Sequence, residues 1–144
     1  MTGETFLLLQ IATTLPLTGL IAFVQFAHYP LLAELGPEAF PRYHARYLER
    51  ITPIVAPLML VELAASIGWA IVAFGSAAFP LAILGLALVG GIWLSTTLLQ
   101  VPCHQRLAAG GRDTATIRRL VRTNAVRTAA WALRSAVVVT AWVA

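Results

Sequence analysis

The stretch FPLAILGLALVGGIWLSTTLLQV, residues 79–101, contains no charged side chain. The hydrocarbon core of a bilayer is about 30 Å thick, and a helix of roughly 20 apolar residues crosses it. This stretch therefore predicts a transmembrane helix.

Three further stretches of similar length are also apolar, at residues 6–28, 51–74 and 124–143. The 144 residues are 59% hydrophobic and only 11% charged, and the mean hydropathy of +0.81 is too high for a surface that water keeps dispersed. The connections between the stretches are too short to bury a core of their own. We therefore expect one all-α domain over residues 1–144, an integral membrane four-helix bundle.

The arginines predict the orientation of this bundle. The chain has no lysine, and all its arginines except Arg127 and Arg134 lie in the connections after the first and the third apolar stretch. The positive-inside rule places these connections in the cytoplasm and both termini on the other side of the membrane. The net charge of +4 then needs no nucleic acid as a partner, because anionic lipids of the cytoplasmic leaflet are sufficient.

The connection after the first stretch has a helical pattern of its own. Phe40, Tyr43, His44 and Tyr47 recur at spacings of three and four residues, while the charged side chains fall on other faces. This pattern predicts a short amphipathic helix that lies on the cytoplasmic membrane surface. In the connection after the third stretch, Asp113 is a good N-cap for a segment that runs into the fourth helix.

Two opposite charges lie at matching depth in the predicted membrane helices. Glu62 is near the midpoint of the second stretch, and Arg134 is near the midpoint of the fourth. An unpaired charge at the bilayer centre costs from about 3 kcal/mol upwards, so we predict a direct contact between Glu62 and Arg134. The pair has two interpretations: a structural ion pair that joins two helices, or a catalytic pair that holds a substrate or relays a proton.

All three histidines, His28, His44 and His104, map to the cytoplasmic half of the bundle. Neutral imidazole binds iron, copper and zinc, so these three are the candidate metal ligands, and His28 and His104 are also candidate catalytic residues. The cofactor stays open between a transition metal, a haem and none. The alternative is that the histidines bond to carbonyl groups or lipid head groups at the interface.

Other polar side chains reach the same height as the histidines. Trp93 and Trp131 lie inside the apolar stretches and are suited either to line a pocket for a flat apolar molecule or to pack in the core. The candidate substrate-binding residues are Gln100, Asn124, Arg127 and Trp131.

Four strings resemble a family of small, uncharacterised bacterial four-helix membrane proteins: HYPLL at 28–32, APLMLVELAAS at 56–66, LLQVPCHQRLAAG at 98–110 and RLVRTNAVRTAAW at 119–131. The likeness covers most of the chain and implies a multi-pass protein of the bacterial inner membrane. The pattern Asn124-x-x-Arg127-Thr128-x-x-Trp131 is more distantly similar to one in anthrone-oxygenase-like membrane proteins, whose characterised members add oxygen to reduced polyketide aromatics. That similarity implies a membrane oxidoreductase or oxygenase.

Three hypotheses for the function follow. An oxidoreductase or oxygenase that acts on a lipophilic substrate predicts a cavity open towards the cytoplasmic leaflet. A non-enzymatic subunit of a larger membrane complex, or a homodimer, predicts a tightly filled interior and an outward-facing stripe of small residues such as Ala87, Gly91 and Ser95. A small proton-coupled exporter would use Glu62, but Arg134 at the same depth argues against it, because an exchanging carboxylate must release its positive partner.

Overall fold

The computed structural model describes residues 2–144, and these residues form helices joined by short turns. Four continuous helical runs extend over residues 3–34, 40–72, 79–110 and 114–143. The first comprises α1 (Gly3–Phe23), the π-helical η1 (Val24–His28) and α2 (Tyr29–Glu34); the second is α3 (Phe40–Val72); the third comprises α4 (Phe79–Ser95), the π-helical η2 (Thr96–Gln100) and α5 (Val101–Gly110); the fourth is α6 (Thr114–Val143).

The first three runs are long and apolar enough to cross a membrane. The fourth run, α6, does not meet the same requirement of length and composition, although residues 124–143 were predicted as a span. Its sequence contains Arg127 and Arg134 in addition to the arginines of its first half. Both of these side chains are buried, with 7% and 0% of their surface exposed, so the charge that lowers the hydropathy of α6 faces the other helices.

The predicted surface helix between the first two stretches is not a separate element. Residues 40–50 are the beginning of α3, which continues without a break to Val72. Phe40 and His44 are buried in the protein, so the apolar face of this segment packs against other helices. The segment continues as one helix because Pro53 and Pro57 are accommodated inside α3 and do not end it.

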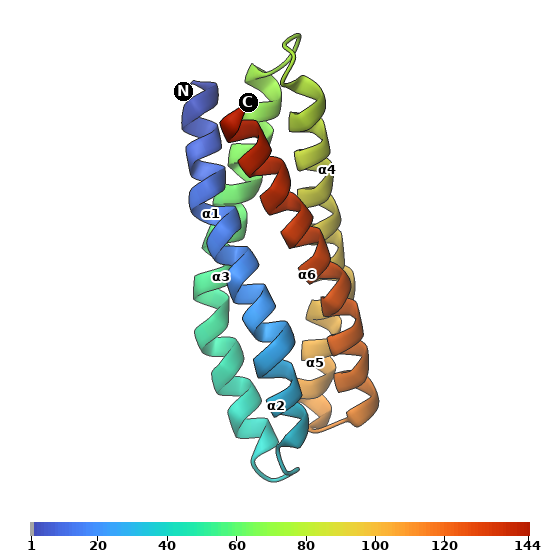
Figure 1. Ribbon diagram of the computed structural model, residues 1–144. Helices are drawn as coiled ribbons and strands as arrows, with labels where there is room; N and C mark the ends of the chain where they lie inside the picture. The colour runs from blue at the N-terminus through green and yellow to red at the C-terminus, as the bar shows by residue number, and fades with distance from the viewer. Residues whose placement is uncertain (1) are drawn as a thin grey trace.

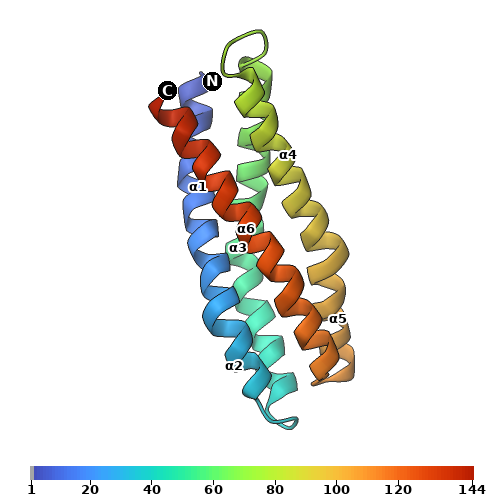
Figure 2. The same ribbon diagram turned by 45° about the vertical axis from the view of Figure 1, so that its right-hand side comes forward.

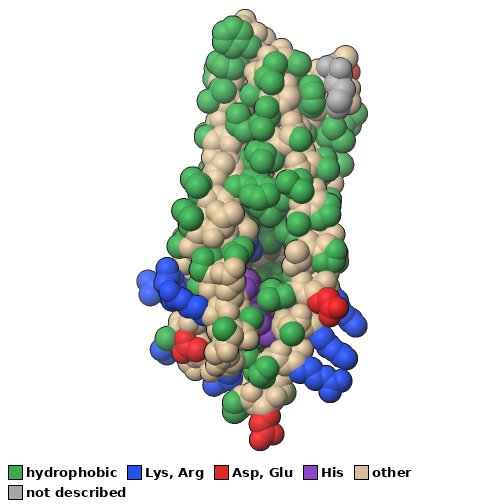
Figure 3. Space-filling view, turned by 180° about the vertical axis from the view of Figure 1, so that it is seen from behind, with side chains coloured by type: hydrophobic (Ala, Val, Ile, Leu, Met, Phe, Trp, Pro, Cys, Tyr) green, Lys and Arg blue, Asp and Glu red, His purple; other side chains and the backbone are tan. Residues whose placement is uncertain are grey.

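The four helical runs lie side by side, and α1 and α4 each pack against both α3 and α6 (Figures 1 and 2). Both termini and the turn after α3 lie at one end, whereas the connections before α3 and before α6 lie at the other (Figure 1). Arginine side chains gather towards this second end, and the rest of the surface in Figure 3 is mainly hydrophobic. We refer to the end with the connections before α3 and before α6 as the arginine end.

The turn before α6 confirms the predicted N-cap. The Asp113 carboxylate accepts hydrogen bonds from the backbone N–H groups of Ala115, at 3.2 Å, and Thr116, at 2.9 Å. Gly111 adopts a φ of 73°, which side chains disfavour, and this lets the chain reverse between α5 and α6. The pKa of Asp113 is lowered by the hydrogen bonds from the Thr116 side chain and backbone, then by that from the Ala115 backbone.

The two halves of the chain repeat one succession of elements at an offset of 72 residues. The π-helical segment η1 at residues 24–28 corresponds to η2 at residues 96–100, and α2 and α5 follow them directly. Pro30 and Pro102 stand at equivalent places just after these segments. A proline has no N–H group for the bond to residue i−4, and a π-helical turn before it is a way to absorb that loss. The first helical run of each half is therefore locally wider near the arginine end.

Candidate active site

Glu62 of α3 and Arg134 of α6 form an ion pair with no exposed surface on either side chain, and this confirms the predicted contact. Nε of Arg134 donates to Oε1 of Glu62 at 2.9 Å. The carboxylate also accepts from the Thr14 hydroxyl at 2.8 Å and from the Ser66 hydroxyl at 3.1 Å. Four hydrogen-bonding groups thus join α1, α3 and α6 in one buried polar network.

Arg134 makes further contacts that fix its position. Its Nη2 donates to Oγ of Ser66 at 2.9 Å and to Oε1 of Gln10. On the opposite side it lies against Gly85 of α4, where a Cβ atom would be 3.2 Å from Cζ of Arg134 and closer still to Nη1. The guanidinium therefore occupies the space that the missing side chain of Gly85 leaves. Neither Glu62 nor Arg134 lines the cavity described next.

A cavity of about 400 Å³ lies nearer the arginine end, between α3 and the run formed by α4, η2 and α5. Most of its lining surface is apolar, and the polar groups include aromatic hydroxyl, imidazole, amide and guanidinium groups. The polar or amphipathic lining residues are Tyr29, Tyr47, Thr52, Trp93, Thr96, Gln100, His104, Gln105 and Arg127. Figure 3 shows histidine side chains inside an opening between helices on this face. The cavity is thus a mainly apolar space with a few polar groups, as is typical of small-molecule sites.

A chain of hydrogen bonds leads from the cavity into the protein. The Tyr29 hydroxyl lies 3.3 Å from Nε2 of His104, and Nδ1 of His104 lies 3.1 Å from Nε2 of His44. Tyr29 and His104 line the cavity, whereas His44 lies behind them with 1% of its surface exposed. A neutral imidazole donates from one nitrogen and accepts at the other, so all protons of this chain point either towards Tyr29 or towards His44. A concerted shift converts one arrangement into the other when a proton enters at the Tyr29 oxygen and another leaves the His44 ring, and it thus moves a proton along the chain.

Arg127 of α6 is the cation of the cavity wall. It is 7% exposed, and within residues 2–144 no carboxylate lies within ion-pairing distance of it. Its Nη1 makes one long hydrogen bond, 3.4 Å, to the Thr96 hydroxyl, and its Nε has no hydrogen-bond partner. A buried charge without a counter-charge is costly, which marks Arg127 as a candidate for binding a ligand.

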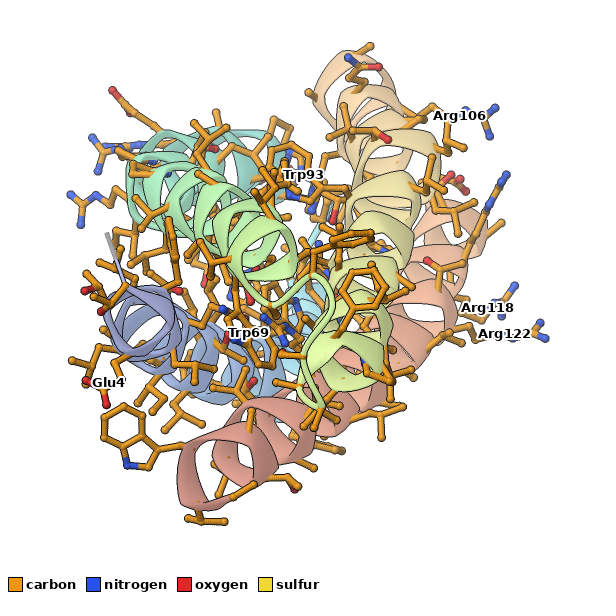
Figure 4. All side chains as sticks on the ribbon, turned by 90° about the horizontal axis from the view of Figure 1, so that it is seen from above. Glu4, Trp69, Trp93, Arg106, Arg118 and Arg122 are labelled. Carbon is orange, nitrogen blue, oxygen red and sulfur yellow. The ribbon has the colours of Figure 1, made fainter. Side chains whose placement is uncertain are left out.

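Two other polar atoms of the cavity residues are buried without a partner. Nε2 of Gln100 donates to the Thr123 hydroxyl at 2.8 Å, which leaves its Oε1 as a free acceptor. Nε1 of Trp93 is a free donor. Figure 4 shows Trp93 between α3 and α4, whereas Arg106, Arg118 and Arg122 point away from the helices. Buried polar groups are nearly always hydrogen-bonded in proteins, so free atoms on one cavity wall indicate a site for a polar head group.

Three predicted site residues lie elsewhere. His28 stacks on Tyr47 at a ring separation of 3.8 Å, and its Nδ1 lies 3.4 Å from the Tyr43 hydroxyl. Asn124 donates to Oε1 of Gln25 at 2.8 Å. Trp131 is buried in an apolar cluster together with Leu17, Ile21, Met59 and Ile92. These residues support the walls and the core of the protein, and none of the three lines the cavity.

The predicted three-histidine metal site is not assembled. Among residues 2–144, no group of three or more His, Cys, Asp or Glu side chains is arranged to hold a metal ion. The reason is geometric: His44 and His104 face one another, while His28 faces the tyrosines of α3. The sequence places all three at one height but does not fix the directions of their rings.

The sequence did not indicate a site role for Tyr29, and it indicated for Tyr47 only a place on the apolar face of a predicted helix. Both line the cavity. A signal for Tyr29 exists in retrospect, because it follows His28 directly and precedes Pro30, where a π-helical segment ends. Segments of this kind frequently occur at functional sites.

Comparisons of the chain with protein-family models, with curated proteins and with solved structures found no match.

Proposed function

We propose that the protein is a four-helix bundle of the bacterial inner membrane, with the arginine end in the cytoplasm and both termini outside. The exposed arginines support this orientation, because they are confined to the connections and helix ends on one side. The two buried arginines of α6 support its membrane insertion, because Glu62 neutralises Arg134 and the other helices surround Arg127. Alkaline phosphatase, which is active only in the periplasm, is expected to show enzyme activity when it is fused to the C-terminus. A reporter that works only in the cytoplasm is expected to give no signal at the same position. The reverse pattern would overturn the orientation.

Within this bundle, the cavity binds a lipophilic small molecule, and the protein acts on it as an enzyme of the oxidoreductase or oxygenase class. The observation that carries this proposal is a mainly apolar cavity of about 400 Å³ whose wall holds the end of the Tyr29, His104 and His44 chain. The reacting group of the substrate lies next to the Tyr29 hydroxyl, because this is where the chain meets the cavity.

The chemical step that these residues supply is proton transfer. An acidic O–H of a bound phenol, hydroquinone or enol breaks, and its proton passes to the oxygen of Tyr29 as the tyrosine proton passes to His104. The proton on Nδ1 of His104 moves on to Nε2 of His44, whose ring becomes an imidazolium and balances the charge of the substrate anion. No electrons leave the substrate in this step. The product is the substrate anion, which is the form that gives up electrons more readily in a later oxidation.

Ligand binding is tested with the protein in phosphatidylcholine nanodiscs and a neutral probe, a 2-methoxy-3-alkyl-1,4-naphthoquinone. Quinones quench tryptophan fluorescence, and Trp93 lines the cavity. We expect saturable quenching that is lost in Ala56→Phe, which fills the cavity, and kept in Ala64→Phe, which alters an exposed position of the same helix. Replacing Trp93 by Phe removes the saturable signal. Equal, non-saturating quenching in all variants would show that the probe only partitions into lipid.

The proton chain is tested by a pH jump on a bound 2-hydroxy-3-alkyl-1,4-naphthoquinone, whose colour reports its ionisation. Tyr29→Phe and His104→Gln are expected to slow the absorbance change at least tenfold, because each breaks the hydrogen-bonded chain. Tyr43→Phe is the matched control, since the Tyr43 ring is 43% exposed and outside the cavity lining. Equal rates in the unchanged protein and in all three variants would contradict the catalytic part of the proposal. Only the proposal of ligand binding would then stand.

The cavity also bears on the alternative of a non-enzymatic subunit. That hypothesis expects a tightly filled interior. This protein instead has a cavity of about 400 Å³ whose lining residues include buried polar atoms without a partner. Its second expectation is an outward stripe of small residues, and the exposed Ala87 and Gly91 on a groove between α4 and α6 are the observation that favours it. Changing Gly91 to Leu and measuring the oligomeric state in detergent tests a packing role for that groove. Unchanged association would leave the cavity as the functional feature.

A further inference from the structure

We infer that the cavity selects a lipophilic anion, and that Arg127 is the residue that recognises its single negative charge. This inference rests on the proposed function, because it concerns the charge of the ligand in the same cavity. The chemical class is an apolar body with one ionised oxygen group, such as a carboxylate, a phenolate, or the anion of a hydroxyquinone.

The distribution of charge in the protein carries the first step. Of the two buried arginines, Arg134 has Glu62 as its partner, and only Arg127 has no carboxylate in contact within the described residues. The remaining arginines are exposed and can be neutralised by water, salt or lipid head groups. The cavity wall thus has one net positive charge that no side chain of residues 2–144 balances. A ligand with one negative charge would balance it.

The hydrogen-bonding atoms without a partner are the second observation behind this inference. Arg127 contributes an Nε donor without a partner, and Trp93 contributes an Nε1 donor without a partner. Both residues line the same cavity. Two donors and a positive charge suit an ionised oxygen, which accepts several hydrogen bonds and makes stronger ones than a neutral oxygen does. Gln100 supplies a free acceptor, Oε1, for a hydroxyl elsewhere on the ligand.

The apolar lining is the third observation behind this inference, because it limits the number of charges that the ligand can have. The cavity wall includes Ile21, Val24, Val55, Met59 and Val101, and among the described residues Arg127 is its one charged side chain. A ligand with two or more charges would bury the extra charges against these apolar groups at a high cost. The ligand is therefore a monoanion with a large apolar part, which enters from the lipid rather than from water.

The inference is tested by comparing a matched pair of probes in phosphatidylcholine nanodiscs. The first is a 2-hydroxy-3-alkyl-1,4-naphthoquinone, which is an anion at neutral pH, and the second is its neutral 2-methoxy counterpart. We expect the anion to bind about 10- to 100-fold more tightly than the neutral probe, the range for a charge-assisted hydrogen bond. In Arg127→Gln this preference should vanish while the neutral probe binds as before. Arg127→Lys should restore most of it, and the exposed Arg122→Gln should leave it unchanged.

The outcomes separate this inference from the proposed function. If both probes bind saturably with equal affinity and Arg127→Gln changes nothing, the charge recognition is wrong while the cavity remains a binding site. If neither probe binds saturably, the proposed function itself is wrong. Adding phosphatidylglycerol to the nanodiscs distinguishes the source of the anion. Unchanged probe binding supports a small lipophilic acid, whereas competition by this lipid supports an anionic head group as the natural occupant of the Arg127 site. A circular dichroism melt of Arg127→Gln checks that the variant is folded.

Discussion

Glu62 and Arg134 occupy equivalent positions in the two halves of the chain, 72 residues apart, and they meet in a buried ion pair of 2.9 Å. Each stands on the second long helix of its half. Opposite charges at these positions therefore hold the two halves together and also make them different from each other.

The first prediction concerns the energy of this pair. Glu62→Gln and Arg134→Met each leave one buried charge or polar group without its partner, and each should lower the free energy of unfolding by about 3–5 kcal/mol. The double variant Glu62→Gln, Arg134→Met should lose less than the worse single variant, because it leaves no buried charge without a partner. Unfolding in mixed detergent measures these energies.

The exposed residues Glu49 and Arg50 offer a matched control. Glu49→Gln and Arg50→Met alter the same residue types on the same helix as Glu62, but at its surface, and we expect changes of about 0.5 kcal/mol or less. Additive energies for Glu62 and Arg134 would mean that the two side chains do not act as a pair.

The second prediction concerns the space above Gly85. A methyl group there meets the Arg134 guanidinium, so Gly85→Ala should lower the free energy of unfolding by about 1–3 kcal/mol. Gly90→Ala on the same helix meets nothing within 4 Å and should be neutral or stabilising by up to about 1 kcal/mol. The comparison uses the same unfolding measurement. A Gly85→Ala protein as stable as Gly90→Ala would contradict the close packing of Arg134 on α4.

The third prediction concerns the protons of His104. In the unchanged protein both ring nitrogens of His104 have a hydrogen-bond partner. Nδ1 is paired with His44 and Nε2 with Tyr29. Replacing His44 by Phe removes the partner of Nδ1, so the tautomer with the proton on Nε2 should become dominant. Nitrogen-15 chemical shifts of the His104 ring measure the tautomer populations. His28→Phe is the control, because His28 makes no hydrogen bond to His104, and populations that respond equally to both variants would disprove the chain.

The fourth prediction concerns pH and the cap of α6. The pKa of Asp113 in the folded protein is lowered by its hydrogen bonds to Thr116 and Ala115. Because the folded state holds the charged form more tightly, its stabilising contribution is present above the ordinary pKa of aspartate and is lost as the pH falls through the lowered value. The protection of the Thr116 amide against hydrogen exchange, measured relative to an unstructured peptide at the same pH, should therefore be high at neutral pH and fall in acid.

The variant Asp113→Ala should have as little protection at the Thr116 amide at neutral pH as the unchanged protein has in acid. Asp113→Asn should keep most of the protection, since an amide oxygen also caps a helix, and should lose its dependence on pH in this range. Protection in Asp113→Ala equal to that of the unchanged protein would show that the cap does not hold the first turn.

The sequence by itself determined the class of this protein, since long uncharged stretches of fixed length predict helices for a simple reason: a backbone in lipid must satisfy its own hydrogen bonds. It also determined the Glu62 and Arg134 contact, because two opposite charges at one depth have few other partners. The Asp113 cap was predictable for a similar reason, since capping depends on neighbours within one turn.

Only the tertiary structure decided which polar groups face the cavity. His28 and His104 map to the same height, yet one stacks on Tyr47 and the other bonds to Tyr29 and His44. Trp131 entered the core and Trp93 the cavity wall, although both lie within apolar stretches. Depth follows from counting residues along a helix, but direction depends on the rotation of each helix. The π-helical turns of η1 and η2 change that rotation, and the packing of the neighbouring helices fixes it.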